Sequence, residues 1–268
     1  MGNAWSSRRD RRRSSWFVPI RLYHIPLSPP GYSAQLALRH KQIAFRVVEL
    51  LGGFHPPLLR VLGFRGNTVP VMKLEDGTKV EGSLAIMQAL ERVAPGAPSL
   101  YPEDAVERRA VEDAERWGEG VLQDVPRRVL RWGLNAQLSQ RQWFADVASP
   151  FPLPKVTGFA LRPIVPLFVR QAGAYDDSVR SDVAALPSTL DVVDRYIADG
   201  VIGDPAAPNA ADFQIAGSLA MLSAFADLRP LFDGRPCLGL TIGLIPDYPA
   251  IPAALPASWV PAARNAAS

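Results

Sequence analysis

Strand-like sequence is confined to the first third of the chain, and this constrains the fold more than any other feature. Residues 20–25, 45–50 and 68–74 carry the alternating, β-branched or aromatic side chains that are typical of strands. A short run at 79–82 follows the third of these after a tight Asp-Gly turn, which predicts a hairpin. Beyond residue 104 only helical patterns remain. The sequence therefore predicts an α/β unit followed by an all-helical unit.

Three helical segments accompany the predicted strands. Helix-forming residues predict a short helix over 32–42, and a turn-rich stretch leads to irregular helical turns over 58–64. A further helix is predicted over 83–93, with Ser83 placed to cap it. The resulting order is strand, helix, strand, helical turn, two strands and helix. This order predicts one mixed sheet covered by helices.

Proline and glycine residues at 94–104 mark a linker to the helical half. We predict the domain boundaries accordingly. A basic tail covers 1–18, an α/β domain 19–94, a linker 95–104 and a helical domain 105–268.

The helical half is predicted to contain one long amphipathic helix and two others. The long helix covers 103–132, with Pro126 expected to kink or divide it. A second helix is expected over 182–200, ended by Gly200, and a third, central helix over 208–225. The apolar face expected for the long helix consists of Val106, Ala110, Ala114, Trp117, Val121 and Val125.

Cysteine and histidine are scarce, which excludes several kinds of site. Cys237 is the single cysteine among 268 residues, so a disulfide framework, a cysteine-based zinc site and a CxxC redox pair are excluded. His24, His40 and His55 are the only histidines and leave little material for a metal cluster. No run of ~18 uncharged apolar residues predicts a membrane span.

Positive charge is concentrated near the start of the chain. Residues 8–13 (RRDRRR) contribute +4 to a formal net charge of +3, so the remainder is close to neutral. We expect a solvated, disordered basic tail. Attraction of these arginines to nucleic acid or to an anionic membrane is the alternative. No apolar core of a secretory signal follows them.

A second ambiguous segment, 149–169, is rich in proline and apolar residues and carries Lys155 and Arg162. We expect it to form a buried wall of the helical domain or a dimer face. Its prolines disfavour the alternative, an amphipathic helix on a membrane surface.

Two local features could hold a small ligand with charged ends. The first is Pro70, because a proline in a sheet stands at a strand start or at an edge. A cis Val69–Pro70 bond would turn the Val69 backbone outward, where it could pair with an extended ligand. A trans proline at an ordinary edge is the alternative. Gly82-Ser83 begins a helix whose free N–H groups attract a carboxylate, unless Ser83 only caps the helix. Glu81 could accept a hydrogen bond from a ligand ammonium.

Ser28 lies between a strand end and a helix start. Its hydroxyl, beside free helix N–H groups, can donate to a thiolate and lower the pKa of the thiol by favouring the charged form. A turn serine without a chemical role is the alternative. Tyr23 and Tyr32 bring further hydroxyls near Ser28, although Tyr23 is more simply explained as a strand side chain.

In order and spacing, these features resemble a known family. Residues 20–93 resemble the thioredoxin-like N-terminal domain of the cytosolic glutathione transferases, and the helical remainder is similar to their C-terminal domain. The run SPPGYSAQLAL, which Ser28 opens, resembles the run that begins with the activating Ser or Cys of the tau, zeta and omega classes. Val69-Pro70 resembles the family's cis-proline pair, and Ser83 in GSLAI resembles the serine of its ESxAI motif.

The resemblance implies a role for each of these residues. Ser28 would activate the thiol of glutathione, the co-substrate, without a metal. The Val69 backbone, next to Pro70, would pair with the cysteinyl part of glutathione. Ser83 would bind the γ-glutamyl carboxylate, and His55 would take the place of a lysine that faces the glycyl carboxylate.

The sequence also departs from the family pattern. Gly82 stands where the motif has Glu, and Glu81, one residue earlier, is expected on the opposite face of its strand. His55 is mostly neutral at pH 7 at its reference pKa of ~6.5. Another small thiol, or none, is therefore the alternative to glutathione. Asn209 and Asp212 resemble the family's capping box, which we interpret as structural.

The function implied is a thiol-activating transferase that acts on small apolar electrophiles in detoxification. We expect the electrophile between the domains, against Tyr32, Trp117, Val121 and the 151–169 segment. The resemblance implies a cytoplasmic homodimer without nucleic-acid or membrane partners, and the excess of arginine over lysine indicates a bacterial source. A catalytically silent protein of the same fold, which binds a ligand or a partner, is the alternative.

Overall fold

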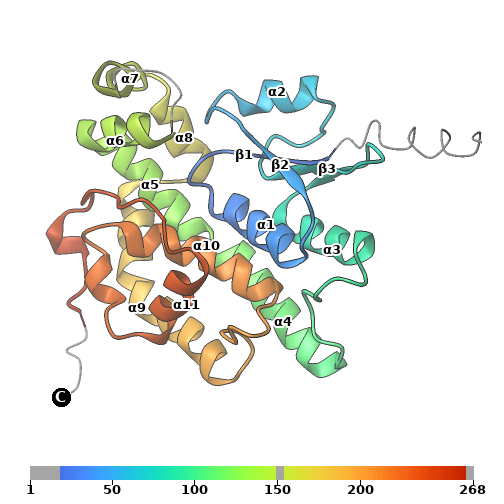
Figure 1. The fold of residues 1–268 in the computed structure, drawn as a ribbon. Helices are drawn as coiled ribbons and strands as arrows, with labels where there is room; N and C mark the ends of the chain where they lie inside the picture. The colour runs from blue at the N-terminus through green and yellow to red at the C-terminus, as the bar shows by residue number, and fades with distance from the viewer. Residues whose placement is uncertain (1–18, 149–153, 264–268) are drawn as a thin grey trace, which may run out of the picture.

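The computed structural model describes residues 19–148 and 154–263 as a sheet-containing domain and a larger helical domain (Figure 1). The predicted basic tail over 1–18 and the part of the proline-rich segment at 149–153 lie outside the described residues.

Four strands form one mixed sheet in the order β2-β1-β3-β4. The central strand β1 (Ile20–His24) pairs in parallel with β2 (Phe45–Glu49). On its other side it pairs antiparallel with β3 (Val71–Lys73), which forms the predicted hairpin with β4 (Lys79–Glu81).

Helices cover both faces of this sheet (Figure 1). The helices α1 (Pro29–His40) and α3 (Ser83–Val93) lie on one face, and α2 (His55–Val61) lies on the other. Side chains alternate between the two faces because neighbouring strand residues point in opposite directions. Leu22 belongs to the main core cluster that includes α1 and α3, whereas Tyr23 belongs to a smaller cluster with Leu59 of α2. The predicted α/β fold class is confirmed, and Tyr23 is a core side chain.

The long helix predicted over 103–132 consists of three pieces. They are α4 (Ala105–Trp117), the π-helical turn η2 (Gly118–Leu122) and α5 (Asp124–Ala136). The division comes just before Pro126, which is the third residue of α5. A proline in the first turn removes no intrahelical hydrogen bond, so it is tolerated there.

The predicted apolar face of this helix is wrong at two positions. Val106 is 78% exposed and Val121 is 54% exposed. Val106 lies five residues from buried Val111, about 140° around the helix, and the π-turn shifts the phase before Val121. The residues actually buried along the three pieces include Val111, Ala114, Glu115, Gly118, Leu122 and Val125.

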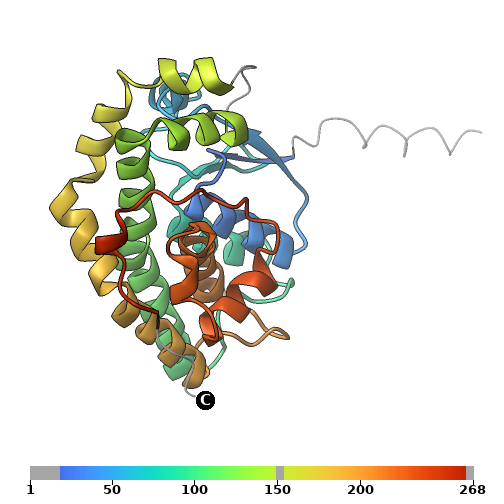
Figure 2. The same cartoon turned by 90° about the vertical axis from the view of Figure 1, so that its left-hand side faces the viewer.

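Further helices complete the helical domain, and α9 and α10 are the longest of them (Figure 2). The predicted 182–200 helix begins earlier, at Asp176, and Gly200 follows its end at φ +71, as expected. The described part of the proline-rich segment contains one short helix and the beginning of a second. No helix among the described residues is long and apolar enough to cross a membrane. The helices are α6 (Leu138–Ala148), α7 (Pro154–Ala160), α8 (Val165–Ala172), α9 (Asp176–Ala198), α10 (Ala210–Ala224), η3 (Arg229–Leu231), α11 (Pro236–Leu244) and η4 (Ala257–Trp259).

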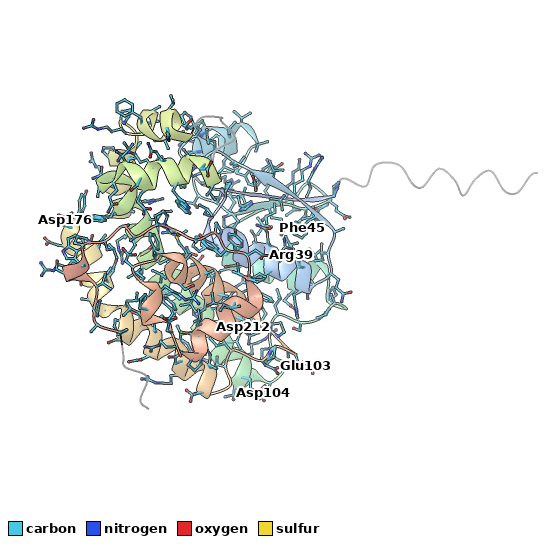
Figure 3. All side chains as sticks on the ribbon, turned by 60° about the vertical axis from the view of Figure 1, so that its left-hand side comes forward. Arg39, Phe45, Glu103, Asp104, Asp176 and Asp212 are labelled. Carbon is cyan, nitrogen blue, oxygen red and sulfur yellow. The ribbon has the colours of Figure 1, made fainter. Side chains whose placement is uncertain are left out.

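The central helix α10 begins with the predicted capping pair. The Asn209 side chain accepts hydrogen bonds from the backbone N–H groups of Ala211 and Asp212. Asp212 accepts in return from the N–H groups of Asn209 and Gly203, at 2.8 and 2.6 Å. Asp212 therefore lies within the helical domain as a structural residue (Figure 3).

The two domains are in close contact where α10 meets the start of α1. A Cβ atom on Gly217 would lie 2.5 Å from the carbonyl oxygen of Pro29. Only glycine allows α10 to approach the backbone of α1 this closely. This contact fixes the start of α1 against the helical domain.

We expect Gly217→Ala to lower the free energy of unfolding by ~1–3 kcal/mol, because the added methyl group must push α10 away from α1. Urea denaturation measures the change. Gly239→Ala in α11 is the matched control, since a Cβ there meets no described atom within 4 Å and alanine favours a helix. Equal stability of the wild type and Gly217→Ala would show that the helices do not depend on this contact.

Candidate functional site

The strand register brings the predicted site residues to one edge of the sheet. Tyr23 near the end of β1 lies opposite Val71 at the start of β3, and Val71 lies opposite Glu81 at the end of β4. The loop carrying Ser28, the residues before β3 and the start of α3 at Ser83 therefore meet there. The end of β2 lies at the same edge because β2 is parallel to β1.

Ser28 is the N-cap of α1 and is half-buried. Its hydroxyl makes no hydrogen bond to any described residue and does not cap the helix. The loop before it is held in place, since Leu27 has a φ of +66 and its carbonyl accepts a hydrogen bond from the Tyr248 hydroxyl at 2.8 Å. The structure thus fixes the backbone at Ser28 and leaves its hydroxyl available.

The free helix N–H groups expected beside Ser28 are mostly missing. Pro29 and Pro30 occupy the first two positions of α1 and carry no N–H, and the Tyr32 N–H already donates to the Ser28 carbonyl. Only Gly31 can offer a backbone donor in this first turn. Fewer backbone N–H donors are thus available at the start of α1 than the sequence suggested, so the Ser28 hydroxyl is the more important donor there.

The Val69–Pro70 peptide bond is cis, as the resemblance implied. The Pro70 carbonyl accepts a hydrogen bond from the Gly82 N–H at 3.0 Å, which ties the start of β3 to the start of α3. The backbone groups of Val69 have no hydrogen-bond partner within the described part of the chain.

Glu81 already has hydrogen-bond partners within the protein, which makes its predicted role toward a ligand ammonium less favourable. Its two carboxylate oxygens accept hydrogen bonds from the backbone N–H groups of Arg65 and Gly66, at 2.8 and 2.6 Å. Glu81 thereby holds the loop before β3. Gly82 is the N-cap of α3 at φ +90, and a Cβ there would meet no described atom within 4 Å.

Ser83 does not cap α3, which corrects a second expectation. It is the first residue of the helix and is 1% exposed. Its hydroxyl donates to a carboxylate oxygen of Glu119 at 3.3 Å, across the domain boundary. Glu119 lies in the π-helical turn η2 and was not predicted from the sequence. The glycines on either side of it, at 118 and 120, were the only local signal.

His55 is the first residue of α2 and is half-buried. Burial lowers the pKa of His55 below its usual value, and the positive charge of Arg131 on α5 lowers it further. The imidazole is therefore neutral at pH 7 and is not the cation that the resemblance implied. Arg131, the second residue missed by the sequence analysis, has no carboxylate within salt-bridge distance among the described residues.

The three predicted substrate residues lie in different places. Tyr32 lines a cavity of about 430 Å³ beside α1, which also includes Leu27, next to Ser28, and Arg39, labelled in Figure 3. Trp117 packs edge-to-face on Tyr196 at 5.7 Å and belongs to the core. Val121 is exposed in η2. Of the three, only Tyr32 lines this cavity.

Negative charge gathers where α4 approaches Ser83. Glu112, Glu115 and Glu119 are spaced three and four residues apart and share one side of the helix. Glu115 is 2% exposed, accepts a hydrogen bond from the Tyr101 hydroxyl at 2.9 Å and has an unpaired second oxygen. Burial, together with the charges of Glu119 and Glu112, raises the pKa of Glu115 to about 7, although the hydrogen bond from Tyr101 opposes the shift.

Within residues 19–148 and 154–263, no three or more His, Cys, Asp or Glu side chains are arranged so that they could hold a metal ion. The groups that the site brings together are hydroxyls, backbone donors and carboxylates.

Comparison with known proteins identifies this arrangement. Residues 22–98 match the family model of the glutathione S-transferase N-terminal domain. The chain has the glutathione S-transferase fold. This confirms the resemblance in the fold and in the N-terminal domain, and the serine-type subclass stays a prediction. No curated protein matches the chain in sequence.

Solved structures with the glutathione S-transferase fold align with most of the chain. A glutathione S-transferase from Rhodospirillum rubrum F11 is 21% identical, with 86% of this chain and 89% of that chain covered and a TM-score of 0.58. One from Ceriporiopsis subvermispora, in complex with glutathione, is 14% identical, with 87% and 99% covered and a TM-score of 0.59. The β-etherase LigF from Sphingobium sp. strain SYK-6 is 20% identical, with 87% and 97% covered and a TM-score of 0.54.

We expect the free energy of unfolding to depend on pH because Glu115 titrates. Its pKa is higher in the folded state than in the unfolded chain, so the folded state binds the extra proton between about pH 4.5 and 7. The free energy of unfolding should therefore fall as the pH rises through this window.

The glutamine in Glu115→Gln cannot titrate, so the variant should not lose this part of its free energy of unfolding as the pH rises. Relative to the wild type, the variant should therefore become more stable at higher pH. Between pH 5 and 8 we expect a shift of about 1–3 kcal/mol. Urea denaturation at both pH values measures it, and all other titrating groups cancel in the difference. A difference that does not change with pH would contradict the raised pKa.

Proposed function

We propose that the protein is a glutathione transferase in which Ser28 activates the thiol of glutathione or a similar small thiol. The unpaired Ser28 hydroxyl at the start of α1 is the observation on which this proposal depends. The fold supports it, as does the glutathione bound to the Ceriporiopsis subvermispora protein. The predicted detoxification role, cytoplasmic location and homodimer belong to this proposal.

The reaction begins when the bound thiol releases its proton to solvent. Ser28 donates a hydrogen bond to the sulfur, which favours the thiolate and lowers the pKa of the thiol. The thiolate sulfur then forms a bond to an electrophilic carbon, and the leaving group departs with the electron pair of the broken bond. Ser28 forms no covalent bond in this sequence.

The place that we propose for the electrophile is the cavity beside Tyr32, whose lining includes Leu27, the residue before Ser28 in the chain. Its walls combine apolar groups such as Leu27 with Arg39 and Glu49, so an apolar body with a polar substituent fits better than a hydrocarbon. The similar structures include transferases and a β-etherase. The fold alone therefore does not decide whether the thiolate is added to the substrate or cleaves it.

The alternative function is a ligand-binding or interaction protein of this fold without catalysis. Three observations favour it: both Glu81 oxygens are occupied, His55 is neutral and the Ser83 hydroxyl is paired with Glu119. Such a protein would bind a thiol without turning it over, or would bind none.

We expect Ser28→Ala to lower turnover of a generic aryl halide with glutathione by about 10-fold or more, because a hydrogen bond to a charged sulfur is worth about 1.5 kcal/mol or more. Ultraviolet absorbance of the bound thiolate, titrated with pH, should show a raised thiol pKa in the variant. Ser28→Thr, which keeps a hydroxyl, should retain part of the activity.

Ser139→Ala is the matched control, since this exposed serine on α6 donates only to Gln137 nearby. Equal turnover by the wild type and Ser28→Ala would remove Ser28 from the reaction. Retention on immobilised glutathione without turnover would support the silent alternative instead.

A further inference from the structure

We propose that the end of the molecule formed by α2, α7 and α8 docks on the surface of an anionic lipid bilayer. The contact is peripheral: apolar side chains enter the headgroup layer and basic side chains face the lipid phosphates. The inference goes beyond the proposed thiol chemistry and does not depend on it. It departs from the resemblance, which implied no membrane partner.

The helix α2 presents an apolar side to solvent. Phe54, Leu58, Val61 and Leu62 are spaced by four, three and one residues, so they share one side of the helix. All four are exposed, and Val61 is 86% exposed. Leu59, on the opposite side, is buried in the cluster against the sheet. A surface helix normally directs its polar side outward, so packing within the protein does not explain this stripe.

The helices α7 and α8 extend the apolar surface. Val156 and Phe159 of α7 and Leu167 of α8 are exposed, with Phe159 at 61%. The loop before α2 lies against α8, since a Cβ atom on Gly53 would be 2.6 Å from the Phe168 ring. In two views that differ by 90°, α2 and α7 stay at the same end of the molecule (Figures 1 and 2).

Exposed apolar side chains are concentrated at this end. Seven of the fourteen large hydrophobic residues that the described chain exposes belong to α2, α7, α8 and the residues next to α2. Single exposed apolar residues are common on a protein surface, whereas a group of this kind marks an interaction site.

The same end of the molecule is positively charged. The segments 50–74 and 154–175, which contain these helices, have no aspartate or glutamate, although the chain has 26 such residues. No carboxylate lies within salt-bridge distance of their basic side chains among the described residues. The positive charge is therefore not neutralised within the described part of the protein. The basic residues are Arg60, Arg65, Lys73, Lys155, Arg162 and Arg170.

The combination of charge and apolar surface favours a bilayer as the partner. A second copy docked symmetrically would place these cations opposite the same cations, which disfavours self-association. Nucleic acid supplies phosphates but no apolar layer to cover the stripe on α2. An anionic bilayer supplies phosphates at its surface and an apolar layer beneath them. An acidic protein with an apolar centre is the competing partner.

Co-sedimentation of the full chain with lipid vesicles tests the proposal. We expect binding to vesicles of equal parts phosphatidylglycerol and phosphatidylcholine, and little binding to phosphatidylcholine alone. Val61→Ser combined with Phe159→Ser should weaken binding about 10-fold or more, because two apolar side chains no longer enter the headgroup layer. Arg60→Glu should weaken it about 5-fold or more, because a cation near the lipid phosphates becomes an anion.

The matched controls change the same kinds of residue elsewhere. Val106 on α4 and Ile242 on α11 are exposed and lie outside the two basic segments, as does the exposed Arg109 on α4. Val106→Ser combined with Ile242→Ser, and separately Arg109→Glu, should change the affinity by less than about 2-fold. Circular dichroism checks that every variant is folded, which we expect because all of these side chains are exposed.

The other outcomes overturn the inference. If the wild type sediments with neither kind of vesicle, this end does not bind lipid, and an acidic protein is the partner that remains. If Val61→Ser with Phe159→Ser binds as tightly as the wild type, charge alone or the basic residues at 8–13 cause the binding. If the wild type binds both kinds of vesicle equally, the anionic lipid is not what the basic residues recognise.

Discussion

The site depends on how the first turn of α1 is held between the two domains. Gly217 of α10 lies against the Pro29 carbonyl, and the Tyr248 hydroxyl donates to the Leu27 carbonyl. The Ser33 hydroxyl also donates to the Pro29 carbonyl, at 3.1 Å. The helical domain thus sets the backbone around Ser28. The orientation of this part of the α/β domain is therefore set by residues about two hundred positions later in the chain.

The charged side chains near the candidate site also come from the helical domain. In the α/β domain, one acid of the expected ligand motif is a glycine, its neighbour Glu81 stabilises a loop, and His55 is neutral. The helical domain brings Glu119 to Ser83 and Arg131 to the neighbourhood of His55. One continuous stretch, α4 to α5, therefore brings a negative charge to the start of α3 and a positive charge to the start of α2. Loss of a motif residue on one side does not by itself imply loss of binding.

Much of the fold could be predicted because its signals are local. Alternation marked the strands, the Asp-Gly turn marked the hairpin, and the capping pair Asn209 and Asp212 marked the start of the central helix. The buried face along α4 and η2 could not be read correctly at two positions, since Val106 lies about 140° around α4 from Val111 and the π-turn changes the phase of the pattern before Val121. Residues such as Glu119 were missed for another reason. They reach the site only through the docking of two domains, which no short motif encodes.

The position of Cys237 has a consequence for the chemistry. This only thiol of the chain is fully buried in the helical domain, and burial raises its pKa to about 12. It therefore stays protonated, out of reach of a small oxidised thiol. No sulfur of the native protein can form a mixed disulfide with the ligand. Any redox chemistry would have to pass between two molecules of the small thiol, with the protein left covalently unchanged.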